Sequence, residues 1–383
     1  MTDAQPFRLP ESFDTALVLG GGNALGAYHL GACENLFAAG LRPGWLVGTS
    51  IGAVTVAILA GNPPETRLER LRTFWRDAMQ ASAGITADHV PDLLRSRFNN
   101  DFALSAPLFG RPGLFRGRFP GLWSILPFVP PDLALRDHAP LRATLERLVD
   151  FDRLNGAPER VSINAIDMVT GNEVWFDNRD TGIEPDHLLA STALAPLFPP
   201  VEIGSRLLCD AGFGNNLPFD RVFLEEPMRD LLCVAIDVYH LGHGRPRTLD
   251  ETVARVQDIG FAFQSQRAAA GILRERSLLR RFDPQSPSAI LAHLAYRAPG
   301  HQRSLKPLDF SRASLEERID QGRKDATAML ARIAEAPHDA PLAHLQLHPA
   351  PEHQPAEPLP GASRRPGGGR PGTGRTSADA GGA

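Results

Sequence analysis

The segment that most restricts the fold of this 383-residue chain is a charge-free run at residues 43–61, "PGWLVGTSIGAVTVAILAG". Its length approaches that of a membrane-spanning helix, but the helix-compatible part is only about half of what a bilayer requires. Gly48 and Gly52 flank Ser50 in the middle of the run, as in a sharp turn between two buried elements. The run therefore predicts a strand, a tight turn carrying Ser50, and a buried helix.

Other segments extend this unit into an α/β fold. "TALVLGGG" reads as an apolar strand, and "ALGAYHLGACENLFAAG" follows it with apolar residues at helical spacing. Two strand-turn-helix units in succession predict a parallel sheet with right-handed crossovers. A hairpin around "VTGN" and buried strands in "RLLCD" and "LLCVAIDVY" make the sheet mixed. Residues 309–336 predict an outer amphipathic helix.

Composition and charge exclude several classes of protein. Hydrophobic residues make up 43% of the chain, the formal net charge is −4, and the body has no long basic run, which argues against nucleic-acid binding. Cys33, Cys209 and Cys233 are odd in number and far apart, which argues against a disulfide framework and against a zinc site. The N-terminus lacks the features of a secretory signal. We expect a cytoplasmic location, with peripheral contact at the inner membrane surface left open.

The chain divides into regions by composition. We expect a flexible tail at residues 1–13, a catalytic domain at 14–220 with a lid-like insertion at 99–136, a C-terminal region at 221–336 that packs on this domain, and a disordered Pro/Gly/Arg-rich tail at 337–383.

The insertion is unusually apolar for a loop. Soluble proteins seldom keep many large apolar side chains in a loop unless they cover a site or meet another surface. Residues 99–130 are therefore predicted to contact a membrane peripherally, with interleaved arginines favouring anionic head groups. The alternative is a long ordered loop packed on the core. The large residues are Phe102, Leu108, Phe115, Phe119, Trp123, Leu126 and Phe128, and the arginines are Arg111, Arg116 and Arg118.

The turn at Ser50 has the features of a nucleophile elbow. Gly48 and Gly52 remove the Cβ atoms that would clash where a strand turns sharply into a helix, and this geometry exposes the Ser50 hydroxyl. The N–H of Ile51 is left unpaired at the helix N-terminus, where it could meet the oxyanion of a tetrahedral intermediate. The bland alternative is that Ser50 is only a small turn residue.

The earlier loop "LGGGNALG" supplies further backbone donors. Ends of adjacent parallel strands lie side by side, so Gly21, Gly22 and Asn23 are expected to approach Ser50 with their N–H groups. A dinucleotide-binding loop is the alternative, but Leu25 stands at the last glycine position of that motif. The expected ribose-binding acid is also missing. We therefore interpret the loop as half of an oxyanion hole.

Two alternatives remain for the general base that accepts the proton of Ser50. In an α/β-hydrolase the nucleophile follows a large part of the sheet, whereas Ser50 already ends the second strand, although His240 and His243 could formally complete a triad. Asp210 is the alternative, because it ends the strand "RLLCD" directly before the flexible "AGFGNN".

These motifs together resemble the patatin-like phospholipase family. The similarity rests on "GGNALGAYHLG", "GTSIG", "ASTALAPLFPPVEI" and "DAGFGNNLP", in the family's order. Further segments resemble a bacterial branch of the family with an additional C-terminal domain of unknown function. The resemblance covers about residues 14–336 and is far more specific than the elbow alone.

The resemblance implies a three-layer α/β/α fold and a serine acyl hydrolase that cleaves lipid esters with a Ser50–Asp210 dyad. It implies no catalytic histidine, and we expect no cofactor and no metal. Asn23 replaces a usual glycine, and Ala211 replaces the glycine that normally follows the aspartate. A scaffold that binds lipid without turnover, or a membrane-surface module of this kind, is the alternative.

Overall fold

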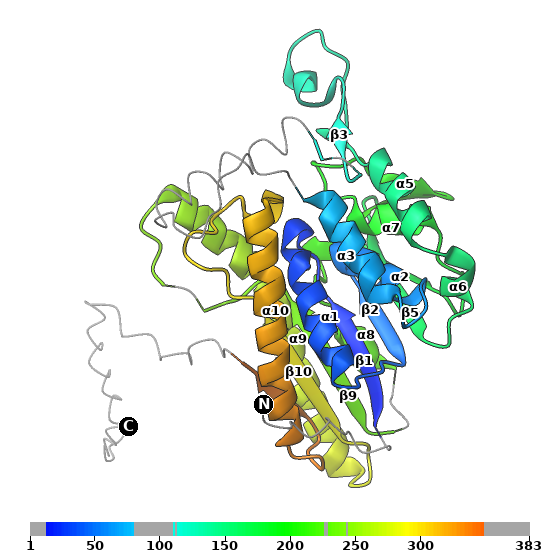
Figure 1. The fold of residues 1–383 in the computed structure, drawn as a ribbon, viewed down its shortest axis with the longest axis vertical. Coiled ribbons are helices and arrows are strands. Elements are labelled where there is room, and N and C mark those ends of the chain that lie inside the picture. Colours follow the sequence, from blue (N-terminus) through cyan, green and yellow to red (C-terminus); the bar gives the residue numbers. More distant parts are fainter. Residues whose placement is uncertain (1–12, 80–109, 112, 226–228, 243, 348–383) are drawn as a thin grey trace, which may run out of the picture. The chain divides into compact units, whose positions relative to one another are not determined.

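The computed structural model describes residues 13–79, 110–111, 113–225, 229–242 and 244–347. These residues form a nine-stranded sheet in the order β11-β10-β9-β1-β2-β5-β8-β7, with β6 also paired to β5 (Figure 1). The strands are β1 (Asp14–Leu19), β2 (Trp45–Gly48), β5 (Arg160–Asp167), β6 (Glu173–Asp177), β7 (Val201–Ile203), β8 (Arg206–Asp210), β9 (Leu231–Asp237), β10 (Ala289–Ala295) and β11 (Ala343–Gln346).

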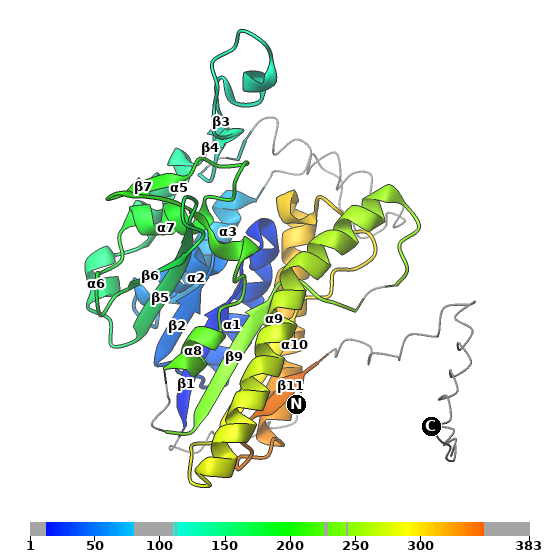
Figure 2. The same ribbon diagram turned by 180° about the vertical axis from the view of Figure 1, so that it is seen from behind.

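Helices cover both faces of this sheet. The helices α1, α2, α3 and α10 lie on one face, and α8 and α9 lie on the other (Figures 1 and 2). The α-helices are α1 (Ala27–Ala38), α2 (Ile51–Ala60), α3 (Arg67–Ala78), α5 (Ala139–Leu148), α6 (Phe151–Asn155), α7 (Pro185–Thr192), α8 (Asp220–Leu224), α9 (Leu249–Phe282) and α10 (Arg312–Ala334). Short 3₁₀ helices are η1 (Asn23–Gly26), η3 (Gly121–Ile125), η4 (Ala211–Phe213) and η5 (Lys306–Leu308).

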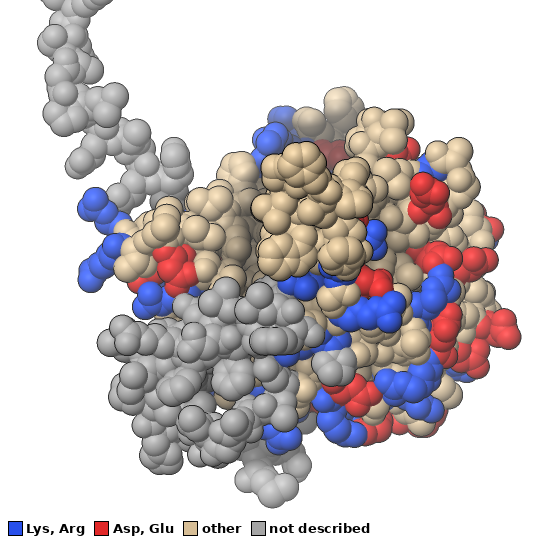
Figure 3. All heavy atoms as spheres, turned by 90° about the horizontal axis from the view of Figure 1, so that it is seen from above, with Lys and Arg blue, Asp and Glu red and all other residues tan. Residues whose placement is uncertain are grey.

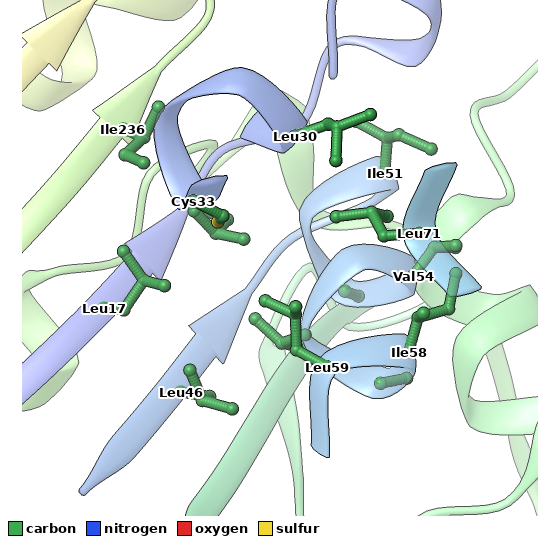
Figure 4. Packing of buried hydrophobic residues seen from close by; sticks show 14 of the residues in the cluster. Leu17, Leu30, Cys33, Leu46, Ile51, Val54, Ile58, Leu59, Leu71 and Ile236 are labelled. Atoms are coloured by element: carbon green, nitrogen blue, oxygen red, sulfur yellow. The ribbon is translucent and has the colours of Figure 1, made fainter. Parts of the chain in front are cut away.

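Successive side chains of the central strands enter different cores. Leu17 and Leu19 of β1 belong to the larger core, which α1 and α2 cover, as the sticks in Figure 4 show for Leu17, Leu46 and Ile58. Ala16 and Val18 belong to the second core, which includes residues of α8 and α9. This alternation is the period of a strand buried on both faces. The predicted three-layer α/β/α fold is therefore confirmed.

Strand pairing also agrees with the expected local elements. Strands β1 and β2 are parallel neighbours, and β2 is parallel to β5. Strands β5 and β6 form the expected antiparallel hairpin, and β8 runs antiparallel to β5. The long apolar run at residues 43–61 becomes β2 and α2, and no helix within the described residues is long and apolar enough to cross a membrane.

The region after residue 220 takes part in the same sheet. Strands β9 and β10 extend it from β1, and β11 pairs in parallel with β10 at its edge. Strand β11 lies inside the range 337–383 that the sequence marks as a disordered tail, so that boundary is too early. The free edge of β10 offers unpaired backbone groups, and pairing with them orders this short segment. Residues 348–383 lie outside the described residues, and the domain boundaries stay a prediction.

A lobe at residues 116–137 projects beyond the sheet (Figure 1). Its base is the two-stranded ladder of β3 (Arg116–Gly117) and β4 (Arg136–Asp137), and its tip contains η3. Asp132 accepts hydrogen bonds from Arg118 and from the N–H of Gly121, at 2.9 and 3.0 Å. These contacts give the lobe a fixed shape without an apolar core of its own.

The lobe exposes its apolar side chains and pairs its arginines. Phe119 is 83% exposed and Trp123 is 59% exposed, so these side chains do not pack on the core. Arg116 and Arg118 form ion pairs with Asp137 and Asp132, at 2.8 and 2.9 Å. The expectation that these arginines attract anionic head groups is therefore weakened, because each already has a carboxylate partner. Phe102 and Leu108 lie outside the described residues.

Candidate active site

Ser50 occupies a strained elbow between β2 and α2. Its φ angle is 55°, in the left-handed region that a side chain rarely adopts. A Cβ on Gly48 would lie 2.5 Å from the carbonyl of Gly52, and one on Gly52 would lie 2.0 Å from the carbonyl oxygen of Leu19. Glycine at both positions is therefore required by close backbone packing, which gives the expected roles of Gly48 and Gly52 a physical basis.

Neighbouring elements hold the elbow in this conformation. The N–H of Ser50 donates to the hydroxyl of Ser191 in α7, at 3.0 Å. The hydroxyl of Thr49 donates to Asn164 in β5, at 2.7 Å. These bonds satisfy the backbone and side chain around the turn, whereas the N–H of Ile51 meets no acceptor among the described residues.

Asp210 reaches Ser50 from the end of β8. Antiparallel pairing places Asp210 opposite Ala165 of β5, the strand next to β2. The Asp210 carboxylate accepts the N–H of Gly212 at 2.7 Å, and the Ser50 hydroxyl lies near enough to lower the pKa of this carboxyl. Burial raises the pKa of Asp210 to about 6, although the nearby Ser50 hydroxyl and the N–H of Gly212 act to lower it. The carboxyl can therefore exchange a proton near neutral pH.

The glycine loop completes this arrangement. The backbone of Gly21 is paired with Asn216, through N–H donation to its carbonyl at 3.2 Å and acceptance from its side-chain amide at 3.1 Å. A Cβ on Gly21 would lie 2.9 Å from Cβ of Ser50. Among the described residues the N–H groups of Gly22 and Asn23 meet no acceptor. Gly21 thus provides close approach, and its amide is already engaged.

All of the expected site residues except the elbow glycines line one cavity. Ser50, Asp210 and the amides at positions 21–23 and 51 line a space of about 350 Å³. Most of its wall is apolar and comes from several elements, including Val54, Phe74, Leu114, Phe115, Leu141, Leu194, Leu197, Phe198, Tyr239, Phe261, Leu305 and Phe310. An acyl chain fits such a lining better than a polar substrate does.

Of the two histidines considered as triad members, His240 does not line this cavity. His240 lies at a separate, small cavity, where the N–H of Gly242 donates to its Nδ1 at 2.9 Å. His243 lies outside the described residues. Among the described residues the cavity has one histidine in its wall, His138, which stacks on Phe198. Burial lowers the pKa of His138 to about 4, so the ring is neutral at pH 7.

Sequence comparison agrees with this geometry. The sequence model of patatin-like phospholipases matches residues 17–223, and a second model, described as patatin phospholipase, matches residues 274–339. The chain belongs to the patatin-like phospholipase family. At the level of the family it is a lipid acyl hydrolase. Among curated proteins, none matches the chain.

Several solved structures are similar to the chain at low sequence identity. VipD from Legionella pneumophila is 14% identical over 84% of this chain and 67% of its own, with a TM-score of 0.39. The type III effector ExoU is 14% identical over 85% of this chain and 54% of its own, with a TM-score of 0.34. ExoU in the heterodimeric complex with SpcU from Pseudomonas aeruginosa is 17% identical over 84% of this chain and 52% of its own, with a TM-score of 0.29.

The two departures from the family's motifs are accommodated. Asn23 has a φ of 52°, a left-handed conformation that asparagine tolerates better than most residues. Ala211 is fully buried in η4 and its φ is not positive, so its Cβ causes no backbone strain there. The N–H of the following Gly212 donates to the Asp210 carboxylate, which caps the start of η4.

Sequence reasoning missed several residues that support the site. Ser191 lies in the quoted segment "ASTALAPLFPPVEI" and Asn216 in "DAGFGNNLP", but only the structure shows that they hold Ser50 and Gly21. The cavity wall also includes Gln257 and Phe261 of α9, and residues near η5. No local signal marks these residues, because they reach the site only through the tertiary fold.

The least expected of them is Arg318 of α10, whose side chain is fully buried. Its guanidinium donates to the carbonyl of Ala24 in η1 at 3.0 Å, and to the carbonyls of Lys306 and Asp309 at 2.9 Å. Two further bonds reach the side chain of Gln302. Arg318 thus ties the glycine loop to the segment that forms another wall of the cavity. A buried arginine of this kind requires such complete hydrogen bonding.

Proposed function

We propose that this protein cleaves carboxylic esters of lipids with a dyad of Ser50 and Asp210. The observation that carries the proposal is the position of Ser50 and the buried Asp210 in the wall of one apolar cavity, where the Ser50 hydroxyl is near enough to the Asp210 carboxyl to lower its pKa. The assignment as a hydrolase of carboxylic esters is finer than family membership alone. It combines an activated hydroxyl, backbone donors and an apolar binding space.

The reaction follows from the positions of these groups. Ser50 Oγ attacks the ester carbonyl carbon while its proton moves to Asp210, and a tetrahedral oxyanion forms. The intermediate collapses as the bond to the alcohol oxygen breaks, and Asp210 returns the proton to the leaving alcohol. Water then attacks the acyl-Ser50 ester while Asp210 takes its proton. This second tetrahedral intermediate collapses as the bond to Ser50 Oγ breaks, Asp210 returns the proton to Ser50, and the fatty acid is released.

The oxyanion is stabilised by backbone donors. The N–H groups of Gly22, Asn23 and Ile51 line the cavity without an acceptor among the described residues. The N–H of Ile51 also lies at the positive end of α2, which favours negative charge. Gly21 is assigned a different role, because its N–H is bonded to Asn216 and its missing Cβ leaves space beside Ser50.

The lobe supplies contact with a lipid surface. It leaves the cavity wall after Phe115 and returns to it at His138, and its tip projects beyond the sheet (Figure 1). Aromatic and aliphatic residues such as Trp123 settle at the boundary between lipid head groups and acyl chains. The lobe therefore holds the cavity at the surface from which the substrate comes.

Active-site labelling tests this function. A fluorophosphonate probe is expected to label the native protein and the Ser304→Ala variant, since Ser304 is another serine in the cavity wall. It should not label Ser50→Ala, which should also lose hydrolysis of a short soluble ester. Hydrolysis by Ser50→Ala at the native rate would refute the proposal, and a native protein that binds lipid vesicles without any turnover would favour the lipid-binding alternative.

A further inference from the structure

A second cavity, of about 420 Å³, lies beside the catalytic one. Its walls come from the segment at residues 244–258, which contains the start of α9, and from residues 298–306. Neighbouring residues of the latter segment face the two cavities, because Ser304 and Leu305 line the catalytic cavity while Arg303 and Lys306 line the second. The two cavities therefore share one wall.

The second cavity has an excess of positive charge. Its two acids are already engaged: Asp258 pairs with Lys306 at 2.5 Å, and Glu251 accepts the backbone N–H of Arg247 at 2.7 Å. Within the described part of the chain no carboxylate forms an ion pair with Arg245, Arg247 or Arg255. The basic side chains in its wall are Arg245, Arg247, Arg255, Arg303 and Lys306, and the acidic ones are Glu251 and Asp258.

Two of these arginines have shielded donors that lack an acceptor. Nη1 of Arg255 and Nε of Arg303 are inaccessible to solvent and meet no hydrogen-bond partner among the described residues. The carboxylates nearest Arg303 belong to Asp250 and Glu251, both at 3.9 Å, which is beyond hydrogen-bonding distance. Shielded donors without acceptors are unfavourable, and an anion with several oxygens would satisfy them.

We propose that this cavity binds the phosphate group of an anionic ligand. Arginine is suited to this role because its fork of N–H donors matches the oxygens of a phosphate. The start of α9 lies at the same end of the molecule as the lobe (Figures 1 and 2). Leu249, at the first turn of α9, is 81% exposed there. The ligand is thus either the head group of an anionic lipid or a soluble phosphate compound.

This site differs from the arginines of the lobe. Arg116 and Arg118 are paired with carboxylates, whereas Arg247 and Arg255 are not paired within the described residues. Figure 3 shows the end of the molecule with the apolar lobe as a tan projection and basic side chains on the surface around it. Attraction to anionic head groups is therefore assigned to the cavity beside α9, and apolar contact to the lobe.

The test uses full-length protein in a Ser50→Ala background, so that its outcome does not depend on the proposed hydrolysis. It compares this parent with Arg247→Gln/Arg255→Gln and with Arg267→Gln/Arg274→Gln, a charge-matched control on exposed positions of α9. Co-sedimentation is measured with phosphatidylcholine vesicles that contain phosphatidic acid, or oleate as an anion without phosphate. Calorimetry measures binding of inorganic phosphate and glycerol 3-phosphate.

The parent is expected to prefer phosphatidic acid vesicles, and Arg247→Gln/Arg255→Gln should weaken this binding about tenfold, while the control pair changes it less than about twofold. Binding only to vesicles identifies a lipid head group, and equally tight binding of glycerol 3-phosphate identifies a soluble ligand. Equal losses in the two pairs, equal affinity for oleate vesicles, or a parent that binds neither phosphatidic acid vesicles nor the soluble phosphate compounds would overturn the proposal. Arg245→Gln, at an exposed position, repeats the test if the double variant does not fold.

Discussion

Two walls of the catalytic cavity come from distant parts of the chain and use their side chains in opposite ways. One wall contains Phe115 and His138, between which the lobe projects with its apolar residues exposed. The other contains Leu305 and Phe310, and behind it Arg318 is fully buried and bonded to the glycine loop. The first wall continues into a lobe that exposes apolar side chains to solvent, whereas the second wall buries the charged guanidinium of Arg318.

Exposed apolar side chains and a buried arginine do not by themselves stabilise the fold. Their presence in the two walls therefore indicates what each wall does. Exposed aromatic side chains are hydrated unfavourably, so the lobe is suited to contact with an apolar surface outside the molecule. A buried arginine is costly unless it is fully hydrogen-bonded, so Arg318 is suited to fixing parts of the molecule relative to one another. We expect the lobe to affect how substrate arrives and Arg318 to affect the reaction itself.

The largest expected effect concerns the dyad, which both walls serve. Asp210→Asn should lower kcat/KM by about a thousandfold or more on soluble and vesicle substrates alike, because the variant cannot accept the proton of Ser50. His138→Gln is the matched control in the same cavity and should change it by less than about threefold, since His138 only stacks on Phe198. Steady-state kinetics measure both, and an inactive His138→Gln beside an active Asp210→Asn would assign the base to the histidine.

The next effect breaks the second wall. Arg318→Met should lower kcat by about a hundredfold on both kinds of substrate, because the glycine loop loses its tie and the oxyanion donors shift. Thermal unfolding should also occur at a lower temperature, since four acceptors lose their partner. Arg312→Met, at an exposed position of the same helix, is the control.

A second variant, Arg318→Lys, separates the effect of Arg318 on the position of the glycine loop from its effect on stability. Arg318→Lys restores a charge but not the fork of donors, so it should recover thermal stability more than it recovers kcat. If kcat of Arg318→Met instead returns to the native value when the assay is run well below its unfolding temperature, Arg318 has only a structural role.

The third effect breaks the first wall. Replacing Trp123, Ile125 and Phe128 by serine should lower activity on phospholipid vesicles about tenfold and leave activity on a short soluble ester within about twofold. These side chains are exposed, so their loss removes no packing from the core. Phe282→Ser, which replaces an equally exposed aromatic residue at the far end of α9, is the control (Figure 2). Equal losses on the two substrates would show that the lobe supports the site itself.

The contrast between the walls also explains what the sequence could predict. Ser50 and the glycine loop follow the adjacent parallel strands β2 and β1, so the geometry of parallel strands was enough to bring them together. Asp210 ends β8, which is antiparallel to β5, so it was predicted from its motif at a strand end and not from that geometry. The exposed lobe was visible as an apolar loop. Its paired arginines were not, because Asp132 and Asp137 become partners only after the loop folds back.

The second wall escaped sequence reasoning for a physical reason. Helix α9 exposes Phe263 and Leu278 but buries Asp258 and Arg276, which blurs the apolar periodicity that marks a helix. The spacing of apolar residues predicts helix α10 correctly. The same pattern would place a charged residue such as Arg318 on the solvent-exposed face. The bond from Arg318 to Ala24 spans 294 positions of the sequence, and no local pattern encodes it.

The smallest expected effect is the pH dependence of kcat/KM. It should not depend on either wall, because Asp210 sets it. Since burial raises the pKa of Asp210 to about 6, kcat/KM should fall to about half of its plateau at pH 6, with the same midpoint on soluble and vesicle substrates. The free carboxyl titrates near pH 3.9, so the folded state binds this proton more tightly than the unfolded state does. The stability that this proton supplies is present below about pH 4 and is lost as the pH rises through about 6. The free energy of unfolding of Asp210→Asn, measured by denaturant titration, should therefore increase relative to the native protein between pH 4 and 7, by about 2 kcal/mol. A midpoint that differs between the two substrates would mean that the lobe or its lipid contact, and not Asp210 alone, sets the pH dependence.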